Sequence, residues 1–102
     1  MIYAQINREE GKTQVLVIGH AEYAEKGKDI VCAGVSALTQ AYILQMETDK
    51  CERIMMEDGV IDAICIDSKD NDVRLSYLKC GLDCIESQYP HYLRVEENKK
   101  IV

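Results

Sequence analysis

The chain has 102 residues, of which 47% are hydrophobic and 29% charged, a composition typical of one soluble globular domain rather than a disordered segment. Its formal net charge of −6 argues against a function based on nucleic-acid backbone contacts, because such proteins carry basic patches. An acidic protein of this kind suits a basic partner instead. No apolar run approaches the roughly 20 residues that span a bilayer, so we expect no contact with a membrane.

The segment 1–12 shows no basic stretch followed by an apolar core, so we expect no signal peptide and a cytoplasmic location. The five cysteines are an odd number, and no two of them form a CxxC pair. In a cytoplasmic protein this pattern predicts reduced thiols. We interpret all except Cys32 as small core residues.

The N-terminal half predicts two strands and a helix. Ile2–Asn7 alternates apolar and polar residues, and Gln14–His20 is β-branched and apolar, so both predict strands. The charged segment Ala21–Lys28 predicts a loop. Asp29 is a natural N-cap for a helix over Ile30–Thr48. The loop therefore joins a histidine at a strand end to the start of a helix.

The C-terminal half predicts two strands, a second helix and a last strand. Cys51–Met56 and Val60–Asp67 predict strands, and the Asp-Gly pair between them is a strong hairpin signal. Val73–Tyr89 has apolar residues at helical spacing and stops at a proline. His91–Glu96 predicts the last strand.

The element order ββαββαβ over a single domain, residues 1–102, predicts an α+β two-layer sandwich. In this fold both helices lie on one face of a largely antiparallel sheet. The first helix carries two apolar stripes, Val31, Val35, Leu38 and Tyr42 on one and Ile30, Ala37, Ala41 and Leu44 on the other. Because a helix on a single sheet buries one face, the second stripe predicts a homodimer.

His20 and Cys32 are the candidate catalytic pair. If Asp29 caps the helix, the sulfur of Cys32 lies in the first turn, where unpaired N–H groups and the helix dipole favour a thiolate. We expect the N–H groups near Cys32 and Ala33 to be free to hold an oxyanion. The loop is long enough to bring the imidazole to the thiol, so His20 would act as general base and then as general acid to the leaving amine.

Two neighbours complicate this hypothesis. The carboxylate of Asp29, one turn before Cys32, opposes thiolate formation. The hydroxyl of Ser36 either contacts the sulfur or donates a hydrogen bond to the Cys32 carbonyl. We favour the hydrogen bond to the carbonyl. Gly27 predicts a loop hinge and Gly34 a close backbone approach. A small packed cysteine with no catalytic role remains the alternative.

A metal site is a competing interpretation of the second helix. Cys80 and Cys84 are four residues apart, and His91 is near in sequence. The two cysteines share a helical stripe with Val73 and Tyr77, so core packing explains them at least as well. We expect no metal and no cofactor.

The run GHA, a loop ending in Gly27 and the run DIVCAGVSAL together resemble the signature of the Prp family of ribosomal-processing cysteine proteases. The resemblance covers the full domain. It implies a small α+β homodimer with a Cys–His dyad. It further implies an enzyme that removes the N-terminal extension of large-subunit ribosomal protein twenty-seven, with no cofactor.

By motif position, the resemblance assigns the general base to His20 and the nucleophile to Cys32. It matches Asp29 and Ser36 to motif positions whose roles stay open. The loop residues Ala21, Glu22, Tyr23 and Gly27 match a mobile segment expected to order over a bound peptide.

Two other functions remain open from the sequence. The first is a non-catalytic ribosome-associated module whose charged loop binds a basic protein tail. The second, a thiol redox or acyl-transfer protein, is weaker because no second cysteine is adjacent to Cys32 to resolve a disulfide.

Overall fold

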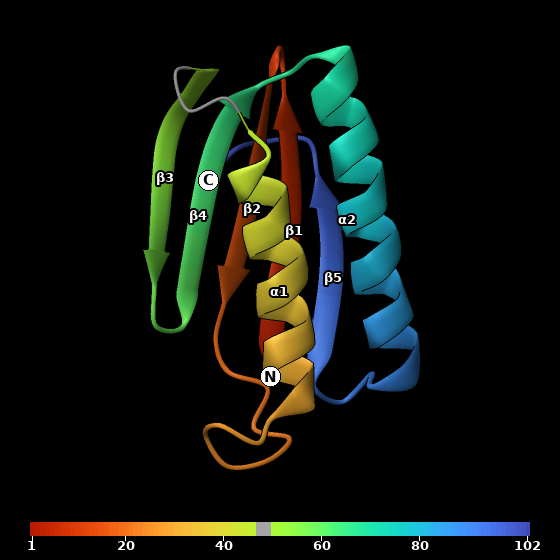
Figure 1. The fold of residues 1–102 in the computed structure, drawn as a ribbon. Helices are drawn as coiled ribbons and strands as arrows, with labels where there is room; N and C mark the ends of the chain where they lie inside the picture. The colour runs from red at the N-terminus through yellow and green to blue at the C-terminus, as the bar shows by residue number, and fades with distance from the viewer. Residues whose placement is uncertain (47–49) are drawn as a thin grey trace.

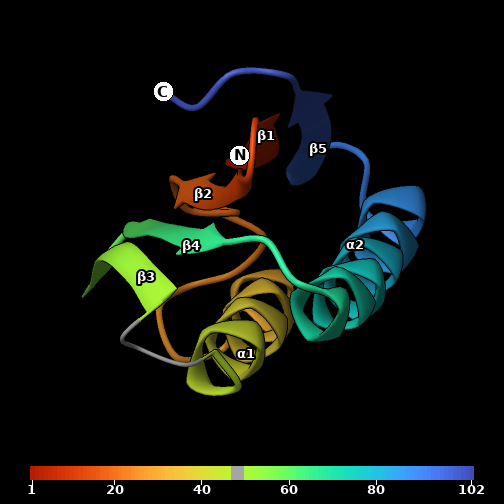
Figure 2. The ribbon, with the colours of Figure 1, turned by 90° about the horizontal axis from the view of Figure 1, so that it is seen from above.

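A computed structural model describes residues 1–46 and 50–102, and within them one sheet carries both helices on the same face (Figures 1 and 2). In chain order the elements are β1 (Ile2–Glu9), β2 (Lys12–Ile18), α1 (Ile30–Leu44), β3 (Cys51–Glu57), β4 (Val60–Ile66), α2 (Lys69–Gln88) and β5 (Leu93–Asn98). The predicted order ββαββαβ and the α+β two-layer architecture are confirmed.

The sheet has the strand order β3-β4-β2-β1-β5. Neighbouring strands are antiparallel except for β1 and β5, which are parallel because α2 carries the chain back across the sheet. The prediction of a largely antiparallel sheet is therefore correct. β3 and β4 form an edge hairpin whose turn lies on the side of the sheet where α1 begins (Figure 1).

Both helices begin at capping residues, but their bounds differ from the prediction. α1 starts after Asp29 as predicted and ends at Leu44; positions 47 and 48 of the predicted helix lie outside the described residues. α2 begins at Lys69, four residues before the predicted start. Ser68 caps α2 by accepting a hydrogen bond from the Asn71 N–H at 3.1 Å, and Asp70 and Asp72 suit a helix N-terminus. The polar residues before Val73 therefore form the first turn of α2.

The core lies between the sheet and the helices. α1 buries Val31, Val35 and Tyr42 of the predicted inner stripe, while its outer stripe is open, with Ile30 55% and Leu44 75% exposed. The helices approach closely at Gly34, where an added Cβ would lie 3.2 Å from the Ile85 Cδ1. The predicted role of Gly34 is confirmed. No helix within 1–46 or 50–102 has the length and hydropathy needed to cross a membrane.

The cysteines differ most from the prediction. Cys51 and Cys65 face each other on β3 and β4 and form a disulfide, so the prediction of reduced thiols is wrong for this pair. They are 14 residues apart, and only the hairpin pairing brings them together. Cys80 and Cys84 are exposed on α2, so their interpretation as core residues is wrong as well.

We expect reduction of the Cys51–Cys65 disulfide to lower the free energy of unfolding by about 3 kcal/mol, because the bond restricts the unfolded chain. Urea unfolding with and without reductant measures this difference. A Cys51→Ala/Cys65→Ala double variant should show no effect of reductant. An equal effect of reductant on wild type and double variant would contradict the prediction.

Candidate active site

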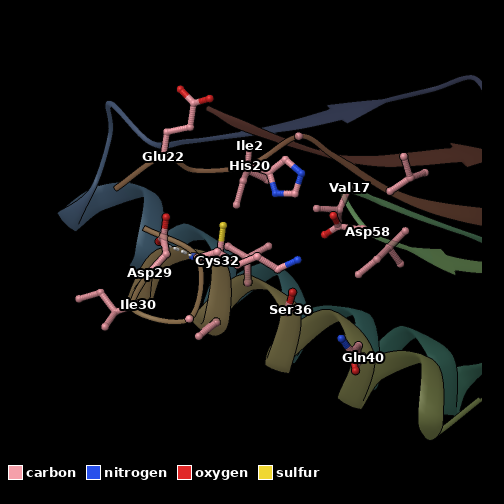
Figure 3. A pocket seen from close by; sticks show the side chains of 18 of the residues that line it. Ile2, Val17, His20, Glu22, Asp29, Ile30, Cys32, Ser36, Gln40 and Asp58 are labelled. Atoms are coloured by element: carbon pink, nitrogen blue, oxygen red, sulfur yellow. Dashed lines mark hydrogen bonds between the residues drawn. The ribbon is translucent and has the colours of Figure 1, made fainter. Parts of the chain in front are cut away.

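Cys32 lies in the first turn of α1 and is half-buried. Its sulfur and the imidazole of His20 point into the same cavity of about 950 Å³ (Figure 3). The walls of this cavity come from the loop after β2, the first half of α1 and the turn of the β3–β4 hairpin. The structure thus brings the two predicted candidates together.

The sulfur has a main-chain hydrogen-bond donor that sequence reasoning did not identify. The N–H of Ala21 donates to the Sγ of Cys32 at 3.3 Å. Ala21 is only 2% exposed and packs in the core, so this donor is fixed in place. A donor N–H favours negative charge on the sulfur it contacts. No sequence signal could have indicated it, because every residue except proline has this N–H group.

Asp29 joins the loop to the start of α1. Its Oδ1 accepts hydrogen bonds from the N–H groups of Val31 and Cys32, both at 3.0 Å. Its Oδ2 accepts from the N–H groups of Tyr23 at 2.9 Å and Ala24 at 3.3 Å. The predicted N-cap is confirmed, and the second oxygen holds the loop as well.

The same contacts shift the pKa of Asp29. Partial burial opposes ionisation, but the four N–H donors outweigh it and hold the pKa of Asp29 below its ordinary value of 3.8. The carboxylate is therefore charged at neutral pH and its charge is shared among main-chain dipoles.

The predicted oxyanion donors are not free in this structure. The N–H of Cys32 is bonded to the Asp29 carboxylate, and the N–H of Ala33 donates to the Asp29 carbonyl at 3.0 Å. The expectation that both were unpaired is wrong, because the cap uses the first and the helix uses the second. An oxyanion beside the sulfur needs donors from another segment or a rearrangement of the cap.

His20 lies two residues beyond the end of β2, because this strand begins and ends two residues earlier than predicted. The chain turns at Gly19, whose φ is 102°, and the imidazole is exposed on the cavity side. The ring packs on the turn of the β3–β4 hairpin, where an added Cβ at Gly59 would lie 2.9 Å from its Nε2. Figure 3 shows the ring facing α1 across the cavity.

The loop is anchored by an aromatic contact in addition to Asp29. The ring of Tyr23 packs edge-on against Tyr89 and Tyr92, with centroids 5.4 and 5.2 Å apart. Glu22 lines the cavity and adopts a φ of 58°, which is uncommon for a residue with a side chain. Gly27 has a φ of 88°, a conformation that favours glycine, and open space around it.

Ser36 lines the cavity one turn beyond Cys32 (Figure 3). Within the described residues, the Ser36 hydroxyl makes no hydrogen bond to the Cys32 carbonyl, so that interpretation is not supported. Its hydroxyl is available to a molecule in the cavity.

The alternative metal site on α2 has two exposed thiols, Cys80 and Cys84. Over residues 1–46 and 50–102, no group of three or more His, Cys, Asp or Glu side chains is placed to hold a metal ion.

A thiol at a helix start and an imidazole in the same cavity are the two groups that a cysteine protease uses. The family model of cysteine protease Prp matches residues 1–94. The chain therefore belongs to the Prp family of cysteine proteases, as its resemblance predicted.

Known proteins support this assignment. The ribosomal processing cysteine protease Prp of Mycoplasma genitalium is 36% identical over 83 residues, covering 78% of this chain and 82% of that protein. The essential ribosomal processing protease Prp from S. aureus, with a covalently linked product peptide, is 29% identical with a TM-score of 0.83. The same S. aureus protein with a substrate peptide is 27% identical with a TM-score of 0.78. Both structures cover 96% of this chain and are themselves covered completely.

We expect Asp29→Asn to separate the two roles of Asp29. The amide oxygen can still cap α1, but the amide nitrogen cannot accept from Tyr23 and Ala24, so the exchange of these two amide protons with solvent should accelerate. Asp29→Ala should lose the cap too, which costs about 1 kcal/mol of stability. Hydrogen exchange and urea unfolding measure the two effects.

The lowered pKa of Asp29 also predicts a pH dependence. Its contribution to stability is fully present above pH 3.8 and is lost as the pH falls through the lowered pKa. Asp29→Asn should flatten this acid limb of the stability profile. Identical acid limbs in wild type and variant would show that the carboxylate contributes nothing.

Proposed function

We propose that this protein is an endopeptidase that removes the N-terminal extension of large-subunit ribosomal protein twenty-seven. The proposal rests above all on the cavity that the Cys32 sulfur and the His20 imidazole share. Relatives named as ribosomal processing proteases support the substrate, and the S. aureus relative holds a peptide.

In this mechanism Cys32 is the nucleophile and His20 the general base. The imidazole takes the thiol proton, and the sulfur attacks the scissile carbonyl to form a tetrahedral intermediate. The protonated imidazole then gives its proton to the leaving amine, which leaves a thioester on Cys32. Water, activated by His20, hydrolyses the thioester and restores the thiol. The N–H of Ala21 donates to this sulfur and holds it in place for attack.

The charges around the cavity suit a basic peptide. Carboxylates at the cavity wall, namely those of Glu22, Asp29, Glu57 and Asp58, outnumber the amines of Lys26 and Lys28. The whole chain has a net charge of −6. A ribosomal protein tail rich in lysine would be attracted to such a surface. Glu22 and Gly27 line the cavity, and the exposed part of the loop that contains them and Tyr23 would close over the bound tail, while the buried Ala21 stays in place.

We assign the enzyme to the cytoplasm, where ribosomal proteins are made, and assign it no cofactor and no direct contact with nucleic acid or membrane. We further propose a homodimer through the outer stripe of α1. This stripe contains Ile30 and Leu44, which are 55% and 75% exposed. Because water contacts this apolar stripe in a single chain, a second copy would gain stability by covering it.

If Cys32 is activated, the most reactive thiol should not be the most exposed one. Cys80 and Cys84 are exposed and Cys32 is half-buried, so access alone would make Cys32 react more slowly. We expect iodoacetamide to alkylate Cys32 about tenfold faster or more, because only a thiolate is a good nucleophile. Peptide mass spectrometry after short exposure measures this. Faster alkylation of Cys80 and Cys84 would contradict an activated Cys32.

Cleavage is tested with a synthetic peptide that spans the extension and the start of the mature ribosomal protein. Wild type should cut it, and Cys32→Ala or His20→Ala should lower kcat/KM by about 10³-fold or more. Cys84→Ala, which removes an exposed thiol, should retain activity. Peptide binding that survives in Cys32→Ala, with no product from wild type, would favour the non-catalytic module instead.

The proposed dimer is tested by introducing a glutamate at each of two similarly exposed positions and measuring the oligomeric state. Leu44→Glu on the α1 stripe should give monomers in sedimentation experiments, because it would bury an unpaired carboxylate at the interface. Tyr77→Glu on α2, where the side chain is 77% exposed, should leave the oligomeric state unchanged. A monomeric wild type would remove the proposal.

A further inference from the structure

We propose that Gly59, at the turn of the β3–β4 hairpin, is a positioning residue for His20. Its lack of a side chain makes room for the imidazole, and its carbonyl holds the chain just before the histidine. The inference rests on the proposed role of His20 as general base and adds a residue that acts through it.

The first observation is a direct contact between the ring and the turn. A Cβ built at Gly59 would lie 2.9 Å from the Nε2 of His20, 3.4 Å from its Cε1 and 3.6 Å from its Cδ2. Real Cβ atoms essentially never come within 3.0 Å of another heavy atom. One edge of the imidazole therefore rests where any other residue would place its side chain.

The second observation is a main-chain hydrogen bond on the other side of the same residue. The N–H of Gly19 donates to the carbonyl of Gly59 at 2.9 Å. Gly19 has a φ of 102°, and a Cβ there would lie 2.6 Å from the Met1 carbonyl oxygen. The residue before His20 is thus fixed between the N-terminus and the hairpin turn.

These contacts matter because the imidazole has little else to hold it. His20 is exposed, and within residues 1–46 and 50–102 its ring makes no hydrogen bond. In many catalytic pairs a carboxylate or amide orients the base through a hydrogen bond. Here the surface of Gly59 limits the directions that the ring can take and turns it toward the cavity that contains Cys32.

The chain supplies a matched control at Gly11, in the β1–β2 hairpin. Gly11 and Gly59 both have a φ of 77°, so alanine is equally strained at the two positions. Nothing lies within 4 Å of the Cβ site at Gly11. The pair Gly59→Ala and Gly11→Ala therefore differs in one respect, the His20 ring in the path of the new methyl group.

We expect Gly59→Ala to lower kcat about tenfold or more with KM changed less than about twofold, because a small displacement of a catalytic group has effects of this size. Gly11→Ala should leave both constants at wild-type values. The chain has two histidines, so NMR resolves their rings separately. The ring signals of His20 should shift in Gly59→Ala, while those of His91 serve as an internal reference.

Two further variants keep the result decisive. Gly59→Asn and Gly11→Asn carry a residue that adopts positive φ more readily, so they fold even if the alanine variants do not. Unshifted His20 signals and a kcat equal to that of the matched Gly11 variant would overturn the positioning role. Full activity of His20→Ala would instead overturn the proposed function. The His20 ring signals of wild type and of the Gly59 variants would still report the contact with Gly59.

Discussion

The site depends on the hydrogen bonds that the carboxylate of Asp29 accepts from the main chain. With one oxygen it starts α1, and with the other it holds the main chain of Tyr23 and Ala24. The same residue therefore fixes the helix that carries the thiol and the loop that follows the histidine. With both fixed, the N–H of Ala21 can meet the sulfur of Cys32 at hydrogen-bond distance. The negative charge of Asp29 lies near the Cys32 sulfur, and the four N–H groups that donate to the carboxylate offset that charge.

The features that local sequence determines were predictable. Strand alternation and helical spacing gave the order of all elements, and an aspartate before an apolar run identified the start of α1 at the correct residue. That cap placed Cys32 in the first turn, and the strand before the loop placed His20 near it. Knowledge of the family signature then selected this pair over a packed cysteine.

The features that depend on distant contacts were not predictable. The hairpin brings Cys51 opposite Cys65. The spacing of the cysteines in the sequence and an expected reducing cytoplasm do not predict this disulfide. α2 has two apolar stripes, and the leucine stripe with Leu78 and Leu82 takes the core, which leaves Cys80 and Cys84 outside. The contact of His20 with Gly59 likewise joins the loop after β2 to the turn of the β3–β4 hairpin, which are far apart in the sequence.

The edge-on packing of Tyr23 against Tyr89 and Tyr92 has a spectroscopic consequence. The chain contains six tyrosines, no tryptophan and no phenylalanine, so its aromatic near-ultraviolet circular dichroism comes from tyrosine alone. Half of those chromophores belong to this one cluster, whose rings couple while they stay in contact. Separation of Tyr23 from the other two would weaken that coupling. The near-ultraviolet circular dichroism of the protein therefore reports whether the loop stays packed against Tyr89 and Tyr92.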